Sequence, residues 1–163
     1  MELGSPAVAL GLLAQQPKVT ATGFHIMAAY ALSSSLMIGT KWAFGRSRPS
    51  GTPDDPANFD WFDGGEDSAF PSGSAAVVFS LATTLAEAID RTPVSVVLYS
   101  GAVLNAWARL NSDRHWLSDV ALGALYGVTV AKLVNGRWSV FGLELPSIWT
   151  DGRSTSMGYS FTW

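Results

Sequence analysis

The chain has 163 residues, of which 48% are hydrophobic and 14% are charged, and its net charge is −3. This length predicts a single domain with a substantial core. The small negative charge offers no basic field for nucleic acid, and the absence of cysteine excludes disulfides and thiolate metal sites.

Three uncharged runs approach the length of a bilayer span, and they cover residues 19–40, 68–86 and 92–108. Their small residues suit close packing in a helical core, but small residues also mark helix contacts within membranes. The composition therefore slightly favours a core and leaves membrane spans open. Residues 1–6 lack the basic segment that begins a signal peptide, so none is expected in this chain.

The first helices are read from apolar periodicity and from breaker residues. Residues 6–16 could form a short helix that the following proline ends. A long apolar helix is expected to start at Thr22 or Gly23 and to stop near Gly45. Residues 46–70 are rich in proline, glycine and acids, which predicts either a lid or binding loop, or a solvated connector. The acids miss the spacing of a calcium loop, so no calcium site is predicted.

Three more long helices follow along the chain. Ser72 can cap a helix over 73–90, and a Thr-Pro pair begins the next, over 92–110. The last is expected over 114–134, where an Asn-Gly pair ends it.

The C-terminal part differs in kind, because residues 137–149 and 155–163 are rich in aromatic and β-branched residues. The second run alternates with period two, which predicts a strand. We therefore predict a mainly α fold, with a helical bundle of about four to five helices over 1–136. A β-hairpin extension over 137–163 is expected to pack on it, although the hairpin could instead be an interfacial or partner-binding edge.

His115 and Asp119 stand four residues apart near the start of the last expected helix. On one helix face the carboxylate could hold one ring nitrogen and leave the other with an outward lone pair. Such a histidine can act as a nucleophile, a base or a metal ligand. Taken alone, the pair is more often an ordinary helix contact.

Three cations could serve one oxyanion. Arg109 ends an otherwise uncharged helical run, so its guanidinium needs an anion, either a phosphate or Asp119. Lys41 and Arg48 flank the end of the first long helix, where each alone is typical of a solvated helix end.

A helix start completes the predicted site. In Pro71-Ser72-Gly73 the glycine lets backbone approach a ligand closely, and the N–H groups of a helix start attract anions. Ser72 could bind the anion, cap the helix, or do both.

In order and spacing these patches resemble the type 2 phosphatidate phosphatase superfamily, which includes lipid phosphatases, bacterial acid phosphatases and vanadium haloperoxidases. The family pattern is Lys-x6-Arg-Pro, then Pro-Ser-Gly-His, then Ser-Arg-x5-His-x3-Asp. Nine of its positions match within residues 41–119, with the correct gaps.

The resemblance implies a role for each matching residue. His115 would attack phosphorus and form a phosphohistidine, and Asp119 would orient it. The phosphate oxygens would be held by Lys41, Arg48, Arg109, Ser72 and the Gly73 backbone. No metal ion or other cofactor is expected, whereas vanadate or phosphate is expected to bind at His115 as an inhibitor.

Two positions depart from the pattern. Ala108 replaces the serine before Arg109, which we treat as a minor loss. Ser74 stands where the family has its second histidine, the general acid that protonates the leaving oxygen. Losing a general acid costs roughly 10²–10⁴-fold in rate. The sequence leaves open whether Ser74 is natural or introduced, and it slightly favours the second.

We therefore expect a phosphatase for a phosphomonoester or diphosphate, lipid-linked or small and soluble, with activity strongly reduced by Ser74. The alternatives are an inactive phosphate-binding or lipid-phosphate-binding module and, less favoured, a vanadium haloperoxidase. The expected partner is a phosphate-containing small molecule or lipid, not nucleic acid. The expected location is the cell envelope, periplasmic or membrane-associated, and no oligomeric state is predicted.

Overall fold

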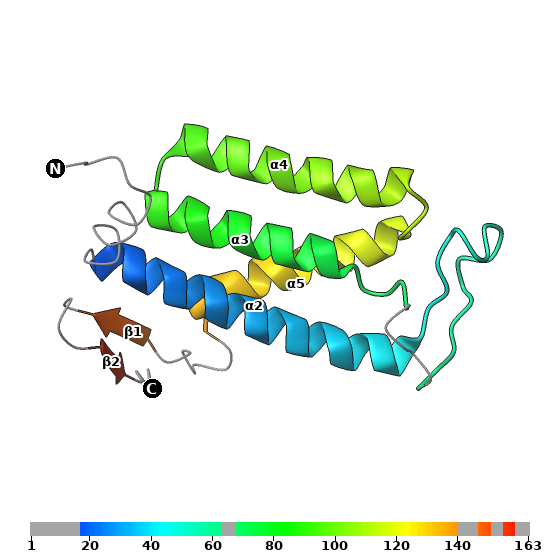
Figure 1. Cartoon of the computed structure of the whole chain (residues 1–163), viewed down its shortest axis with the longest axis horizontal. Helices are drawn as coiled ribbons and strands as arrows, with labels where there is room; N and C mark the ends of the chain where they lie inside the picture. The colour runs from blue at the N-terminus through cyan, green and yellow to red at the C-terminus, as the bar shows by residue number, and fades with distance from the viewer. Residues whose placement is uncertain (1–16, 63–67, 140–146, 151–154, 159–163) are drawn as a thin grey trace, which may run out of the picture.

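The computed structural model describes residues 17–62, 68–139, 147–150 and 155–158. Its helices are α2 (Pro17–Phe44), α3 (Gly73–Ile89), α4 (Thr92–Asn111) and α5 (Leu117–Val134). Helix α3 is central, because it packs against α2, α4 and α5 (Figure 1). The predicted mainly α fold is confirmed over the described residues. The short helix expected over 6–16 lies outside them.

Two predicted helix starts were wrong, for different reasons. Helix α2 already begins at Pro17. Proline is well tolerated at the first helical position, because the N–H that it lacks would have no acceptor within the helix. Helix α5 begins later than expected, at Leu117, because Trp116 is its N-cap residue. The Asp119 side chain accepts the backbone N–H of Trp116 at 2.7 Å and closes this cap. His115 therefore precedes the helix.

Helices α3 and α5 pack backbone against backbone. Helix α5 carries Gly123 and Gly127, four residues apart, on the face toward α3. A Cβ atom at Gly123 would overlap the carbonyl oxygen of Ser72, and one at Gly127 would overlap that of Ala76. Pairs of small residues at this spacing allow close helix contact in apolar bundles. The contact also joins the start of α3 to α5.

The exterior of the bundle is unusually apolar. Large hydrophobic side chains are exposed on every helix, and the most exposed, Val97 of α4, is 71% accessible. Helix α5 and residues 18–44 of α2 are each long and apolar enough to cross a membrane. Exposed apolar side chains along such helices are compatible with membrane association.

Two short strands follow the helices. Strands β1 (Ser147–Thr150) and β2 (Thr155–Gly158) pair antiparallel, with Ser147 opposite Gly158. The residues between and around them lie outside the described ones. The hairpin over 137–163, and its separation from a helical domain over 1–136, stay predictions.

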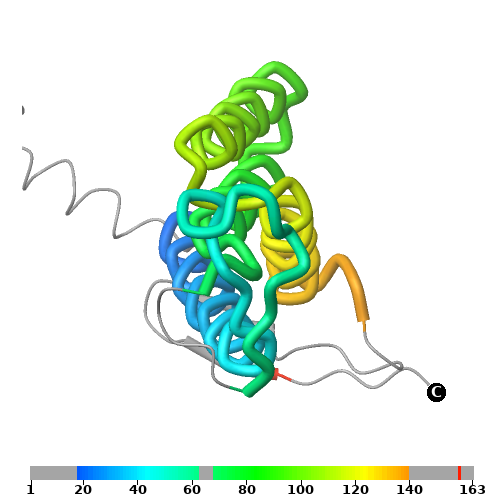
Figure 2. Tube along the Cα trace, turned by 90° about the vertical axis from the view of Figure 1, so that its right-hand side faces the viewer, coloured from blue at the N-terminus to red at the C-terminus, as the bar shows by residue number. Residues whose placement is uncertain are grey.

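One end of the bundle gathers four helix termini. The ends of α2 and α4 and the starts of α3 and α5 meet there (Figure 1). Figure 2 looks onto this end and shows the connection between α2 and α3 passing in front of the helix termini. The three sequence motifs, at residues 41–49, 71–74 and 109–119, therefore lie at the same end of the molecule.

Candidate active site

The helix termini place every predicted site residue near this end. Lys41 lies in the last turn of α2 and Arg109 in the last turn of α4, and Arg48 follows α2 in the connection. Ser72 is the N-cap residue of α3, followed by Gly73 and Ser74 in its first turn. His115 and Asp119 lie on either side of Leu117, the first residue of α5.

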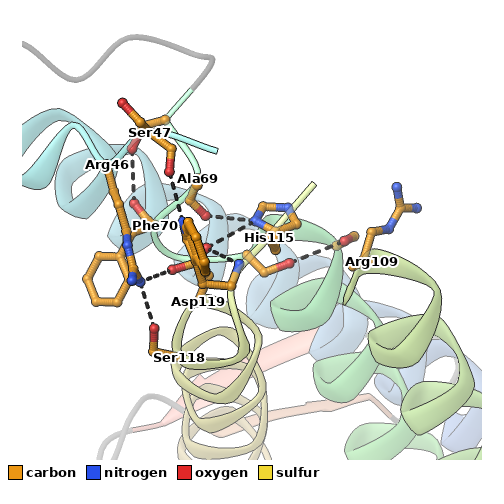
Figure 3. Close-up of polar contacts among 12 residues, drawn as sticks. Arg46, Ser47, Ala69, Phe70, Arg109, His115, Ser118 and Asp119 are labelled. Atoms are coloured by element: carbon orange, nitrogen blue, oxygen red, sulfur yellow. Dashed lines mark hydrogen bonds and ion pairs between the residues drawn. The ribbon is translucent and has the colours of Figure 1, made fainter. Parts of the chain in front are cut away.

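His115 is held by a backbone carbonyl rather than by a carboxylate. Its Nδ1 lies 2.8 Å from the carbonyl oxygen of Ala69 and 3.8 Å from Oδ2 of Asp119 (Figure 3). The expected pairing along one helix face is therefore not the observed geometry. Because a carbonyl can only accept, Nδ1 carries the proton in the neutral ring and Nε2 has the lone pair. The side chain is only 11% accessible.

Asp119 is fully buried and is paired with an arginine that lies outside the three sequence motifs. Its Oδ1 lies 2.5 Å from Nη1 of Arg46 (Figure 3). The same nitrogen donates to Oγ of Ser118 at 2.6 Å, and Nε donates to the carbonyl oxygen of Pro56. Asp119 thus acts first as the buried partner of Arg46. From the sequence, Asp119 was expected to orient His115 or, alternatively, to form an ion pair with Arg109.

Aromatic rings surround the Arg46 guanidinium. Its central carbon lies 5.2 Å from the ring centroid of Phe59 and 5.4 Å from that of Trp116. Cation–π contacts of this kind are favourable when the cation is desolvated. The sequence signal that could have revealed Arg46 is a second arginine beside Arg48, followed by an aromatic-rich connection.

Hydrogen bonds hold the connection between α2 and α3 in place beside the site. The N–H of Ala69 donates to the carbonyl of Arg46 at 2.7 Å, which joins the two ends of the connection. The Trp116 indole donates to the carbonyl of Ser47 at 3.0 Å, and the N–H of Ser50 donates to the carbonyl of Asp113. These bonds anchor the connection to the turn between α4 and α5.

The start of α3 presents backbone N–H groups. Ser72 is buried, and its own N–H donates to the carbonyl oxygen of Asp119 at 2.9 Å. Its hydroxyl makes no capping bond and lies 3.4 Å from the hydroxyl of Ser74. The first N–H groups of a helix lack acceptors within it and favour an anion. Ser72 therefore occupies the predicted cap position without capping through its side chain.

The three predicted cations stand in different settings. Lys41 donates through Nζ to the carbonyl of Ser68. The Nε atom of Arg109 is buried and has no hydrogen-bond partner among the described residues. Figure 3 shows Arg109 and Arg46 on opposite sides of His115. Convergence of Lys41, Arg48 and Arg109 on a single oxyanion stays a prediction.

The geometry fits nucleophilic chemistry on an oxyanion. An imidazole that contacts Ala69 through Nδ1 lies at the same end of the bundle as the start of α3 and Arg109, whose buried Nε has no hydrogen-bond partner among the described residues. The position of the expected proton donor holds Ser74, whose hydroxyl is a poor acid near neutral pH.

Comparison with known proteins shows the family of the chain. The model of the PAP2 superfamily matches residues 20–139, which include all three patches. A lipid A 1-phosphatase of Porphyromonas gingivalis is 36% identical over 110 residues, which cover 66% of this chain. The chain matches about a fifth of that relative, 21% of its length. No solved structure matches the chain.

Proposed function

Because the chain belongs to the PAP2 superfamily, we propose that its active site hydrolyses a phosphate ester of a membrane lipid. The single observation that carries the chemistry is the Nδ1 contact of His115 with the Ala69 carbonyl, since it leaves Nε2 free to attack. The 1-phosphate of lipid A is the first substrate to test, because a 36% identical relative bears that name. The apolar exterior of the bundle suits a lipid-linked substrate.

The proposed reaction has two displacements at phosphorus. In the first, Nε2 of His115 attacks, the bond from phosphorus to the lipid oxygen breaks, and a phosphohistidine forms. In the second, water attacks phosphorus and releases inorganic phosphate and the free imidazole. The positive charge of the phosphorylated ring develops 3.8 Å from Asp119, whose buried carboxylate would stabilise it.

The chain supplies groups to hold the transferring phosphoryl group. Arg109 carries a buried Nε without a partner among the described residues, and the first turn of α3 offers backbone N–H groups. Lys41 and Arg48 are proposed to add positive charge from the side of α2. Phosphoryl transfer depends mainly on such positioning and charge stabilisation.

Ser74 is proposed to limit the first step. The leaving lipid oxygen must take up a proton, and a serine hydroxyl donates one poorly near neutral pH. The expected consequence is slow turnover with retained binding of phosphate or vanadate. If the site never turns over, the same geometry describes a binding module for lipid phosphates, and Ser74 is the observation that favours it.

The test compares the chain with Ser74→His. Release of phosphate from lipid A 1-phosphate and from a short-chain phosphatidate should rise by about a hundredfold or more, because a general acid contributes roughly 10²–10⁴-fold. The matched control is Ser112→His, an exposed change at the same end of the bundle, which should leave the rate unchanged. His115→Asn added to Ser74→His should abolish the gain.

Two outcomes would count against this assignment. A gain that survives His115→Asn would rule out the phosphohistidine route. No gain in Ser74→His, with vanadate still bound in a manner that needs Arg109, would favour the binding module instead.

A further inference from the structure

A second polar site lies at the end of the bundle opposite the candidate active site. A cleft of about 270 Å³ opens between the start of α2, the end of α3 and the residues that follow α5. Its polar lining comes from Lys18, His25, Thr84, Glu87, Asn135 and Arg137. None of these residues has a role in the proposed reaction.

The charge of this cleft favours an anion. The one carboxylate of the lining, Glu87, accepts from Nζ of Lys132 at 3.1 Å and from Nδ2 of Asn135 at 2.7 Å. Lys132 therefore pairs with Glu87, and Nε of Arg137 also lies 3.9 Å from Oε2 of the same carboxylate, so two cations face this one acid. Lys18 and Arg137 leave the lining with a net positive charge, which suits a phosphate group.

The wall of the cleft also holds unsatisfied polar atoms. Thr84 Oγ1 and Asn135 Oδ1 are buried and have no hydrogen-bond partner within the part of the chain that the structure describes. Buried polar atoms are nearly always hydrogen-bonded in proteins. The Thr84 hydroxyl can donate to an anion, whereas the Asn135 carbonyl oxygen needs a donor, such as a hydroxyl of the lipid headgroup.

Two apolar hollows that share Ile26 adjoin the cleft and together form a groove along α2 and α3, which lie side by side in Figure 1. Lys18 and Thr22 line both the cleft and the groove, and Ile26 continues the groove toward Met27 and Tyr30. On α3 it is lined by Ile89, Leu85, Leu81 and Val77.

The length of the groove matches one leaflet of a bilayer. The groove spans Lys18 to Tyr30 of α2, about 18 Å at 1.5 Å per residue. One leaflet is half of the hydrocarbon core of about 30 Å. A polar, cationic cleft at one end of an apolar groove of this length fits a headgroup and its acyl chain.

We propose that the chain binds an anionic phospholipid of the leaflet opposite the active site. The lipid phosphate lies in the cleft between Lys18 and Arg137, and one acyl chain follows the groove between α2 and α3. A free phosphate ion could fill the cleft but not the groove, so the groove selects the lipid.

The experiment is a lipid titration of the full chain in a neutral detergent, with bound lipid counted by native mass spectrometry. The probe is dioleoyl phosphatidylglycerol, with dioleoyl phosphatidylcholine for comparison. Lys18→Gln and Arg137→Gln should each weaken phosphatidylglycerol binding about fivefold, since a cation near a membrane surface contributes about 1 kcal/mol toward anionic lipid. Arg91→Gln is the matched control, because it lies at the same end but outside the cleft.

The groove is tested by Gly23→Leu. Gly23 lines the groove and has open space where a side chain would begin, so the change should block the acyl chain and spare the fold. Gly39→Leu is its control on the same helix, also with open space. Lipid binding should fall in Gly23→Leu and persist in Gly39→Leu.

Three results would overturn the proposal. Equal losses in Arg91→Gln and Lys18→Gln would indicate general surface charge. Unchanged lipid binding in Gly23→Leu, with inorganic phosphate binding as tightly as the lipid, would indicate a free-anion site. Equal binding of phosphatidylcholine and phosphatidylglycerol would remove the role of the cations.

Discussion

Asp119 is a fully buried carboxylate whose charge is balanced from outside its own helix. Arg46 reaches it from the connection that follows α2, at 2.5 Å, and Trp116 adds a backbone N–H. Removing one partner of such a pair leaves a charge in the interior without compensation. That loss costs far more than the loss of an exposed ion pair.

Arg46→Gln should therefore lower the free energy of unfolding by about 3–5 kcal/mol, because Asp119 stays buried and loses its cation. Urea titration of the purified chain in a mild detergent measures the change. Arg114→Gln, an exposed arginine at the same end, should shift it by less than about 0.5 kcal/mol. Similar costs for the two variants would show that the Arg46–Asp119 pair contributes little.

The hydrogen bond to Ala69 makes a prediction about the protonation of His115. In the neutral ring Nδ1 should carry the proton and Nε2 should be free, since the Ala69 carbonyl can only accept. Nitrogen-15 NMR distinguishes the two tautomers. The chain has only two histidines, so His25→Gln assigns the signals. A dominant Nε2–H form would contradict the proposed nucleophile.

For single residues, the sequence predicted the position along a helix better than it predicted the ion-pair or hydrogen-bond partner. Lys41 and Arg109 lie in the last turns of their helices, as expected, because helix ends follow local signals, whereas His115 was expected within a helix and precedes α5. The sequence assigned Asp119 to His115 or Arg109, whereas the structure pairs it with Arg46. That pair joins segments separated by 73 residues, and no local pattern encodes such a contact.

Among the elements, the contact of α5 with α3 depends on two glycines. Gly123 and Gly127 bring α5 against the carbonyls of Ser72 and Ala76, so the backbone of α3 leaves no room for a side chain. Backbone atoms cannot rotate away as a flexible side chain can. The helices would have to separate, and the start of α3 would move with them.

Gly127→Ala should therefore destabilise the bundle by about 1–3 kcal/mol, the usual cost of overpacking. Gly101→Ala is the matched control on α4, where a Cβ meets nothing within 4 Å. It should stabilise the protein by up to about 1 kcal/mol, because alanine favours a helix over glycine. Thermal unfolding of both variants measures the difference. A stabilised Gly127→Ala would show that α5 and α3 are less close than described.

The elements also show why helix starts were harder to predict than helix centres. Apolar runs identified the bodies of α2 to α5, since burial and length leave few alternatives. Each helix start depends on a single residue, and the same residue type can either end a helix or begin one. Pro17 was expected to end one helix and in fact begins another, and Trp116 caps α5 although tryptophan is not a usual cap residue.

For the whole molecule, the apolar exterior and the two long apolar helices, α2 and α5, are compatible with association with a membrane. Helix α4, with 20 residues, carries exposed apolar side chains as well. One of its outward side chains, Leu104, is 68% exposed near the middle of the helix. The acids of the connection after α2 and the cations around Lys18 lie at opposite ends. If the bundle crosses a bilayer, these two ends should face water on opposite sides of it.

The chain has no cysteine, so single cysteines report this arrangement directly. In sealed vesicles, a membrane-impermeant maleimide should label Asp54→Cys and Arg91→Cys from opposite sides, because these exposed residues lie at opposite ends of the bundle. Leu104→Cys should stay unlabelled until denaturing detergent is added, because its surroundings are lipid. If Leu104→Cys reacts in sealed vesicles as fast as Asp54→Cys, the exposed faces of the helices meet water. The bundle would then lie outside the bilayer, and the proposed lipid groove between α2 and α3 would lose the leaflet that fills it.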